Sequence, residues 1–338
     1  MAMKRASHAT RIGDQSGIGE ARRAALGMAS AAGFDENGAG KVAIAVTEAA
    51  SNVLKHAGGG EILLRPLDGG VEMLALDKGE GIANMAEAMR DGGSTAGTNG
   101  IGLGAISRMA SVFDIYSLPG SGTVVLAQFY QPDSDASLRG GLQMGVAQSP
   151  YPGESSCGDA WACMGTSMFV VDGLGHGILA ASAAAAAIEM FERNWERPAR
   201  QIIEYVHGAL RSTRGAAVAV AAIDMQARKL RFCGLGNISG TILAGGETRG
   251  LMSQNGTAGH AAERITELEY AWPEEALLVM HTDGISAKWD LGTYRGLAVR
   301  HPSLCAGVLY RDFRRQRDDA TILVVRSAPP RQSSRGAR

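Results

Sequence analysis

Along the first 130 residues, apolar side chains are spaced as in a helix in some segments and as in a strand in others. Residues 39–57 carry small and branched apolar side chains three and four positions apart, which predicts an amphipathic helix ended by the glycines at 58–60. Strand-like runs follow at 61–67 and 71–77, and Asp68-Gly-Gly70 between them favours a hairpin turn. A short helical piece at 83–90, a helix at 103–111 and strands at 112–117 and 123–130 complete an antiparallel α+β pattern.

Strand-like runs dominate the second half of the chain. Helices are expected at 177–193, 198–213 and 302–315. The expected strands are 142–148, 160–164, 168–171, 216–224, 229–235, 239–243, 276–281 and 321–326. Because strands lie on both sides of the first helical pair, the pattern predicts a β-sandwich with helices packed outside it.

A polar segment without periodicity separates the two patterns. We expect domains at 1–130 and 140–327, a linker at 131–139 and a frayed tail rich in Pro, Ser and Arg at 328–338. A length of 338 residues agrees with two domains.

Composition narrows the function classes. Lys+Arg is 33 against Asp+Glu 34, and aromatic residues make up only 5%, which argues against a nucleic-acid-binding surface. None of the four cysteines forms a C-x-x-C pair, so a zinc ribbon is excluded. No signal peptide is visible, and the longest apolar run, 178–191, is too short to cross a bilayer. We therefore expect a cytoplasmic protein without a membrane partner.

The first candidate site combines a polar helix face with two glycine clusters. Glu48, Asn52 and His56 recur every four residues and share one side of the predicted helix. A carboxylate beside an amide oxygen suits a magnesium–triphosphate site, although a solvated helix face would show the same spacing. Asp77-Lys-Gly-Glu-Gly81 follows a strand, where the Asp can accept from an exocyclic amine or simply form a turn.

Gly100-Ile-Gly102-Leu-Gly104 leads into a helix, so its backbone amides could cradle phosphate. The sequence is not a P-loop, because it lacks the Lys-Ser/Thr that ends that motif. Residues 91–99, between the two glycine clusters, have the composition of a lid.

These motifs, in this order and followed by Gly122-Thr123, resemble the GHKL (Bergerat) ATPase fold over about residues 10–130. Ala88-Met-Arg-Asp-Gly-Gly-Ser-Thr95 resembles the anti-sigma-factor serine kinases, in particular the RsbT-like switch kinases. The resemblance implies an α/β sandwich that binds ATP, with Asn52 on Mg²⁺, Glu48 as general base, Asp77 on adenine and Thr123 supporting that contact. The nucleotide-binding glycines would be Gly79, Gly81, Gly100, Gly102 and Gly104.

The second candidate site is a set of aspartates at predicted strand ends: Asp159, Asp172, Asp283, Asp318 and Asp319. Hard divalent cations prefer carboxylates, and two ions about 3.5–4 Å apart can lower the pKa of a shared water for attack on phosphorus. Each aspartate taken alone could equally be a turn former or a helix cap. His176 could be a polar helix cap or lie near the metals.

The motifs around these residues resemble the SpoIIE-like branch of the metal-dependent PPM phosphatases, most closely RsbX-like phosphatases, over about 140–327. The resemblance implies a β-sandwich flanked by helices, Mn²⁺ or Mg²⁺, and ligands from Asp159, Asp172, Asp283 and Asp318, with a carbonyl from Gly173. Asp318 is preferred to Asp319 because it is the first residue of the family motif, and because neighbours on a strand point to opposite sides. Thr282 departs from the Ser that usually precedes the third Asp.

The two resemblances together imply a signalling enzyme that removes phosphate from serine or threonine of a partner protein and joins this activity to a serine kinase domain. The partner would be a phosphorylated protein, a STAS-domain antagonist or a stressosome-like scaffold in bacterial partner switching. One alternative keeps the phosphatase and makes the GHKL half a non-catalytic, ATP-gated binding module. A purely non-catalytic scaffold is disfavoured by the complete set of aspartates.

Overall fold

The computed structural model describes residues 7–90, 102–132, 134, 141–262 and 264–328. The expected lid at 91–99, Gly100, most of the linker at 131–139 and nearly all of the tail at 328–338 therefore lie outside the described residues. Within the described part of the chain, no helix is long and apolar enough to cross a membrane.

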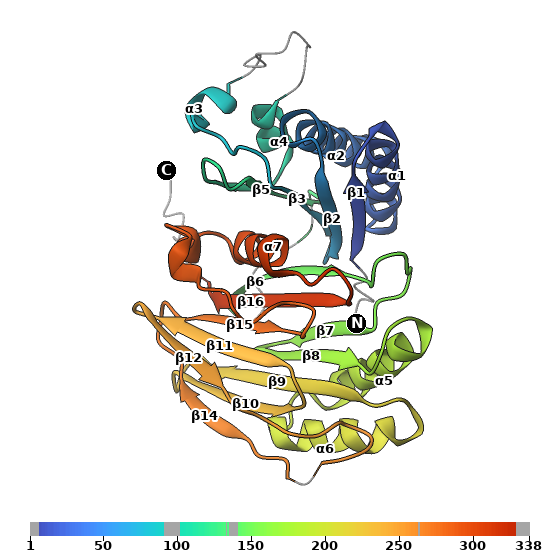
Figure 1. Cartoon of the computed structure of the whole chain (residues 1–338), viewed down its shortest axis with the longest axis vertical. Coiled ribbons are helices and arrows are strands. Elements are labelled where there is room, and N and C mark those ends of the chain that lie inside the picture. The colour runs from blue at the N-terminus through green and yellow to red at the C-terminus, as the bar shows by residue number, and fades with distance from the viewer. Residues whose placement is uncertain (1–6, 91–101, 133, 135–140, 263, 329–338) are drawn as a thin grey trace, which may run out of the picture.

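The N-terminal domain is an antiparallel sheet with helices on one face (Figure 1). Its strands run in the order β1 (His8–Ile12), β2 (Gly60–Leu67), β3 (Gly70–Asp77), β5 (Thr123–Tyr130) and β4 (Val112–Ser117). The helices are α1 (Gln15–Ala31), α2 (Glu36–Ala57), α3 (Met85–Ala88) and α4 (Leu103–Met109). The expected hairpin is confirmed, because Leu67 pairs with Gly70 across a two-residue turn.

The C-terminal domain is a sandwich of two sheets. One sheet has the order β13 (Ser253–Gln254), β10 (Lys229–Leu235), β9 (Ala216–Asp224), β8 (Ser167–Gly173) and β7 (Asp159–Met164), with β14 (Leu268–Ala271) on β10. The other has the order β12 (Glu247–Leu251), β11 (Ser239–Ala244), β15 (Leu277–His281), β16 (Ala320–Ser327) and β6 (Leu142–Ser149). The outer face of the first sheet packs against α5 (Ile178–Asn194) and α6 (Ala199–Ala209). The predicted sandwich with external helices is thus confirmed.

Helix α7 (Pro302–Phe313) lies between the two domains. Every residue from Pro302 to Tyr310 is buried, because one side packs on β6 and β16 and the other on β3 and β5. Gly307 allows this close approach: a Cβ there would lie 2.9 Å from Val124 Cγ1. The molecule is therefore layered as helices, sheet, α7, sheet, sheet, helices (Figure 1).

Because α7 covers the second face of the N-terminal sheet, strand β3 is buried on both sides. Val71, Met73 and Ala75 face α1 and α2, whereas Leu74 and Leu76 face α7. Both faces of this antiparallel strand are buried, which explains its nearly continuous run of apolar residues.

The sequence patterns missed β1, α1 and β12 to β14. Helix α1 buries small side chains, Ala21, Ala25 and Ala29, so it lacks the stripe of large apolar residues that marks an amphipathic helix. Strand β12 is exposed at four of its five positions and therefore shows no hydrophobic alternation.

Candidate functional site

A cavity of ≈ 340 Å³ opens between α2, α4 and the ends of β3 and β5. Such a volume falls within the range of small-molecule sites, about 300–1,000 Å³. The cavity gathers seven of the residues expected to bind nucleotide, from four separate stretches of the chain: Glu48, Asn52, Asp77, Gly79, Gly81, Gly102 and Thr123. His56 also lines it, whereas Gly104 is buried inside α4.

Asp77 is held in a fixed orientation at the end of β3. Its Oδ1 accepts hydrogen bonds from Gly79 N at 2.9 Å and Thr123 N at 3.1 Å. Thr123 Oγ1 lies 2.9 Å from Ser117 Oγ, and Ser117 Oγ accepts from Ile82 N at 2.8 Å. Ser117, which the sequence patterns did not single out, therefore ties the two loops beside Asp77 together.

Glu48 projects from α2 into the same cavity. Partial burial raises the pKa of this carboxyl above its ordinary value. A carboxylate with a raised pKa is a better proton acceptor than an exposed one, as a general base requires.

The second site lies where strands of both C-terminal sheets end. Asp159 on β7 is paired directly with Asp172 on β8, so their side chains share one face. Asp283 follows β15, and Asp318 and Asp319 precede β16, which pairs with β15. The segment that follows β15 passes very close to the segment that precedes β16. Gly284 permits this approach, since a Cβ there would lie 1.8 Å from Asp319 O.

Hydrogen bonds between the two sheets orient the acidic groups. Thr282 Oγ1 donates to Asp159 Oδ2 at 2.7 Å, and Thr321 N donates to Thr282 Oγ1 at 3.1 Å. Gln148 Nε2 donates to the Asp159 carbonyl and to Thr321 Oγ1, both at 3.1 Å. Asn237 Nδ2 donates to Asp283 Oδ2 at 2.8 Å. Thr282, Gln148 and Asn237 are thus positioning groups.

Burial, together with mutual repulsion, raises the pKa values of three carboxyl groups in the cluster. Burial, followed by the charges of Asp283, Asp318 and Asp319, raises the pKa of Asp172 to about 8. Burial and the neighbouring Asp172 raise the pKa of Asp159 well above its usual range. The pKa of Asp318 is raised by burial and then by Asp283 and Asp319. The cluster is unfavourable when fully ionised, unless positive charge is supplied to it.

Two carboxylate oxygens of the cluster lack a hydrogen-bond partner among the described residues, although both are buried: Asp159 Oδ1 and Asp319 Oδ2. Buried charged oxygens are normally paired or bound to metal, so these residues fit divalent cations. Among the described residues, however, no three acidic, histidine or cysteine side chains already form a metal cage. The carboxylates therefore lie near one another without forming a closed metal site.

The structure also brings Asp319 to this site, beside Asp318. Asp319 Oδ1 accepts from Tyr151 N at 2.8 Å. Both residues precede β16, and after burial the charges of both raise the pKa of Asp172, so both carboxylates lie near that residue. The choice of Asp318 over Asp319 as the ligand stays a prediction. Gly173, at the end of β8, donates its N–H to Gly158 O at 3.0 Å, next to Asp159.

His176 lies at the rim of this site. Its ring stacks on Tyr151, with 4.5 Å between ring centroids, and its Nδ1 contacts the Glu154 carboxylate. Tyr151 and Glu154 were not recognised in the sequence, because neither lies in a strand or helix with a readable pattern.

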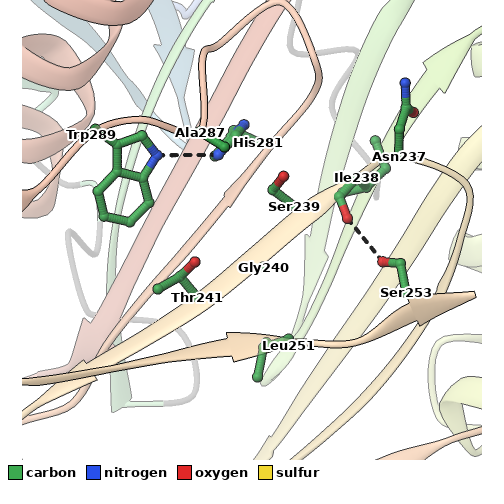
Figure 2. Close-up of a pocket in the computed structure, with 10 residues that line it drawn as sticks. All are labelled: Asn237, Ile238, Ser239, Gly240, Thr241, Leu251, Ser253, His281, Ala287 and Trp289. Carbon is green, nitrogen blue, oxygen red and sulfur yellow. Dashed lines mark hydrogen bonds between the residues drawn. The ribbon is translucent and has the colours of Figure 1, made fainter.

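A second cavity, of ≈ 290 Å³, is lined by the residues that Figure 2 shows. Asn237, which contacts Asp283, stands at one end, and Ser239, Thr241 and Trp289 line it. Trp289 Nε1 donates to His281 Nε2 at 3.2 Å, and His281 Nδ1 contacts Thr282 O, so this ring is neutral with its proton on Nδ1.

Comparison with known proteins agrees with this division. Residues 14–129 match the family of histidine kinase-like ATPase domains, and residues 164–328 match Stage II sporulation protein E (SpoIIE). The serine/threonine-protein kinase RsbT of Bacillus subtilis is 32% identical over 111 residues, which are 32% of this chain and 84% of RsbT. The phosphoserine phosphatase RsbX of the same organism is 25% identical over 150 residues, 43% of this chain and 75% of RsbX.

A solved structure from work on the bacterial stressosome is also similar. It has a TM-score of 0.51 and 27% sequence identity, over 55% of this chain and 99% of that one.

The fold and the two sites define a two-domain protein. Its N-terminal domain has an ATPase-like pocket, and its C-terminal domain is a phosphatase-like sandwich with an acidic site. The chain belongs to the RsbT-like family of histidine kinase-like ATPase domains, fused here to a SpoIIE- and RsbX-like phosphatase domain.

Proposed function

We propose that the C-terminal domain hydrolyses phosphoserine or phosphothreonine on a partner protein, and that the N-terminal domain binds Mg-ATP and phosphorylates the same class of partner. The observation that carries the first part is the acidic cluster, in which five aspartates from distant segments meet and two buried oxygens lack hydrogen-bond partners among the described residues. Domain limits at 1–130 and 140–327, joined by 131–139, are part of this proposal.

The proposed ligands for Mg²⁺ or Mn²⁺ are Asp159, Asp172, Asp283 and Asp318, with the carbonyl of Gly173. Bound cations would supply the positive charge that the carboxylates lack and would lower the pKa of an attacking water. Thr282 and Gln148 hold Asp159 in place, and Asn237 holds Asp283. No Ser or Cys nucleophile is required.

In the N-terminal pocket, Asp77 is proposed to accept a hydrogen bond from the exocyclic amine of adenine, with Thr123 fixing its carboxylate. Asn52 would hold Mg²⁺, and Glu48, with its raised pKa, would accept the proton of the serine or threonine hydroxyl. Gly79, Gly81, Gly102, Gly104 and Gly100 are the proposed backbone contacts of the nucleotide.

The partner is proposed to be a phosphorylated STAS-domain antagonist or a stressosome-like scaffold protein. The similarity to RsbT, to RsbX and to a structure from the stressosome study supports this choice. A kinase and a phosphatase acting on one partner would set its phosphorylation level through ATP.

The phosphatase proposal is tested by phosphate release from a phosphoserine protein during a Mn²⁺ titration. Asp172→Asn should abolish metal-dependent release. The matched control is Asp224→Asn, at the end of β9, where the carboxylate only caps a turn through Gln226 N and Ala227 N. Full activity of the Asp172 variant would overturn the ligand assignment.

The kinase proposal is tested with labelled ATP and candidate STAS proteins in the Asp172→Asn background, where the product cannot be removed. Glu48→Ala should abolish transfer, whereas Glu36→Ala, an exposed position in the first turn of the same helix, should not.

A second candidate function keeps the phosphatase and makes the N-terminal domain an ATP-gated binding module. One observation favours it: α7 of the phosphatase domain is packed into the back of the nucleotide-binding sheet. ATP binding without transfer to any partner would select this alternative.

A further inference from the structure

The nucleotide cavity is built by residues of the N-terminal domain, yet a residue of the C-terminal domain supports it from behind. Arg311, in the last turn of α7, donates from Nη1 to the backbone carbonyl of Asp77 at 3.1 Å. Its Nε and Nη2 donate to the two carboxylate oxygens of Asp312 at 2.9 and 2.8 Å. The Arg311 side chain is 5% exposed, so this charged hydrogen bond is shielded from water.

The backbone of Asp77 lies at the end of the pairing between β3 and β5, where the hydrogen bond from Arg311 supports it. The ladder between β3 and β5 ends at Leu76 and Val124, so the backbone of Asp77 lies one residue beyond it on that side. Within the cavity, the Asp77 carboxylate is fixed by Gly79 N and Thr123 N. Arg311 fixes the carbonyl of the same residue, so carboxylate and backbone are held from opposite sides.

The helix that carries Arg311 is firmly attached to the N-terminal sheet. Ser303 Oγ, at its start, donates to Glu72 Oε2 at 2.8 Å, and Tyr310 OH donates to Glu61 Oε2 at 3.1 Å. Together with the apolar contacts around Gly307, these bonds attach α7 to the sheet at both of its ends. The position of the Arg311 side chain is therefore set by a rigid element rather than by a loop.

We propose that Arg311 is a positioning residue of the nucleotide pocket. It holds the Asp77 backbone so that the carboxylate is aligned with the exocyclic amine of an adenine ring, and it thereby sets the preference for adenine over a purine without that amine. This inference rests on the proposed role of Asp77 and gives the phosphatase domain a direct part in nucleotide selection.

The test compares the affinities of ATP and ITP for the full chain, measured by calorimetry in the presence of Mg²⁺. ITP carries the same phosphates and ribose but has an oxygen in place of the amine. Arg311→Ala should raise the Kd for ATP about tenfold, ~1.4 kcal/mol, and leave the Kd for ITP nearly unchanged. Arg311→Lys keeps a charged donor without the paired contacts to Asp312, so its ATP/ITP ratio should be intermediate.

The matched control is Arg300→Ala. Arg300 crosses the same interface, where Nη1 donates to Asp114 Oδ1 at 3.1 Å, but Arg300 does not contact Asp77. This variant should keep the wild-type ATP/ITP ratio.

An unchanged ratio in both Arg311 variants, or an equal loss of ATP and ITP binding, would overturn the inference, because a merely structural role weakens both nucleotides alike. Failure of the premise looks different: a wild-type chain that binds ATP and ITP equally well would show that Asp77 does not read the adenine amine. Asp77→Asn gives the reference for lost selection.

Discussion

Thr282 Oγ1 donates a 2.7 Å hydrogen bond to Asp159 Oδ2, from a segment that follows β15 in one sheet to the first residue of β7 in the other. The same oxygen accepts from Thr321 N, so this hydroxyl is fully used and completely buried. Neither sheet alone could orient Asp159. The acidic cluster therefore depends on the packing of the sandwich.

Thr282→Val should impair the phosphatase through this hydroxyl. Valine has the shape of threonine but leaves Thr321 N and one Asp159 oxygen without their partner, and each unsatisfied buried group costs about 1–3 kcal/mol. We expect a lower thermal midpoint and a Mn²⁺ requirement raised about 10- to 100-fold, as for other groups that orient metal ligands. Thr282→Ser retains the hydroxyl and should keep near-normal activity. A fully active valine variant would contradict this role.

The two adjacent aspartates before β16 can be separated by their amide variants. Asp318→Asn should abolish metal-dependent activity, because Asp318 lies near both Asp283 and Asp172. Asp319→Asn keeps the acceptor for Tyr151 N, so we expect residual activity with a Mn²⁺ requirement raised about 10- to 100-fold. The measurement is phosphate release against Mn²⁺ concentration. The reverse order of effects would make Asp319 the principal ligand.

Glu72 is the polar centre of the domain interface. It pairs with Arg65 at 2.7 Å and accepts from Gln128 and Ser303, with a side chain that is 1% exposed. Burial opposes its ionised form, but Arg65 and its other partners prevail and lower the pKa of Glu72.

Glu72→Ala leaves Arg65 buried without its charge partner and should reduce the free energy of unfolding by about 3–5 kcal/mol. Arg65→Met combined with Glu72→Met removes both charges and should recover most of that loss. Urea unfolding of the three proteins measures this. Equal destabilisation in the single and double variants would show that the pair contributes through packing alone.

His301 should make the domain interface sensitive to mild acid. Its Nδ1 accepts from Ser303 N at 3.1 Å at the start of α7, so the bond requires an unprotonated nitrogen. Burial lowers the pKa of His301 below 6.5. The charged and titratable groups that face it are Glu72, Arg65, Asp114 and Arg326.

Because the unfolded chain binds the His301 proton more readily, stability should fall as the pH drops below 6.5 towards the lower folded pKa. Asn is a good N-cap that does not titrate, so His301→Asn should flatten this part of the pH profile while α7 keeps its cap. Urea unfolding between pH 5 and pH 7.5 provides the comparison. An identical slope in the variant would exclude His301 as the cause.

The local patterns predicted much of the secondary structure. Helix α2 was expected at 39–57 and begins three residues earlier at Glu36, where the Asp35 side chain accepts from Gly38 N. Strands β2, β3, β4 and β5 lie within one residue of their predicted limits. These elements were readable because their hydrophobic period and their terminating glycines act within a few residues of chain.

Contacts between distant segments were not readable. Helix α7 was expected as a helix, but nothing in its residues indicated that it would be buried between two sheets or that Arg311 would reach Asp77. Asp319 was recognised as a candidate, but its hydrogen bond from Tyr151 N, 168 residues earlier in the chain, was not readable from a local pattern.

Local sequence was enough to predict most of the helices and strands and to identify the aspartates and glycines of both sites, because side-chain period and motif spacing are local properties. Three features became visible only in the folded chain: which oxygens approach one another, which buried oxygens lack a partner among the described residues, and which domain supports the proposed nucleotide pocket. The physical reason is that charge repulsion, burial and hydrogen-bond geometry depend on distances across space, and packing of the sheets on α7 sets those distances.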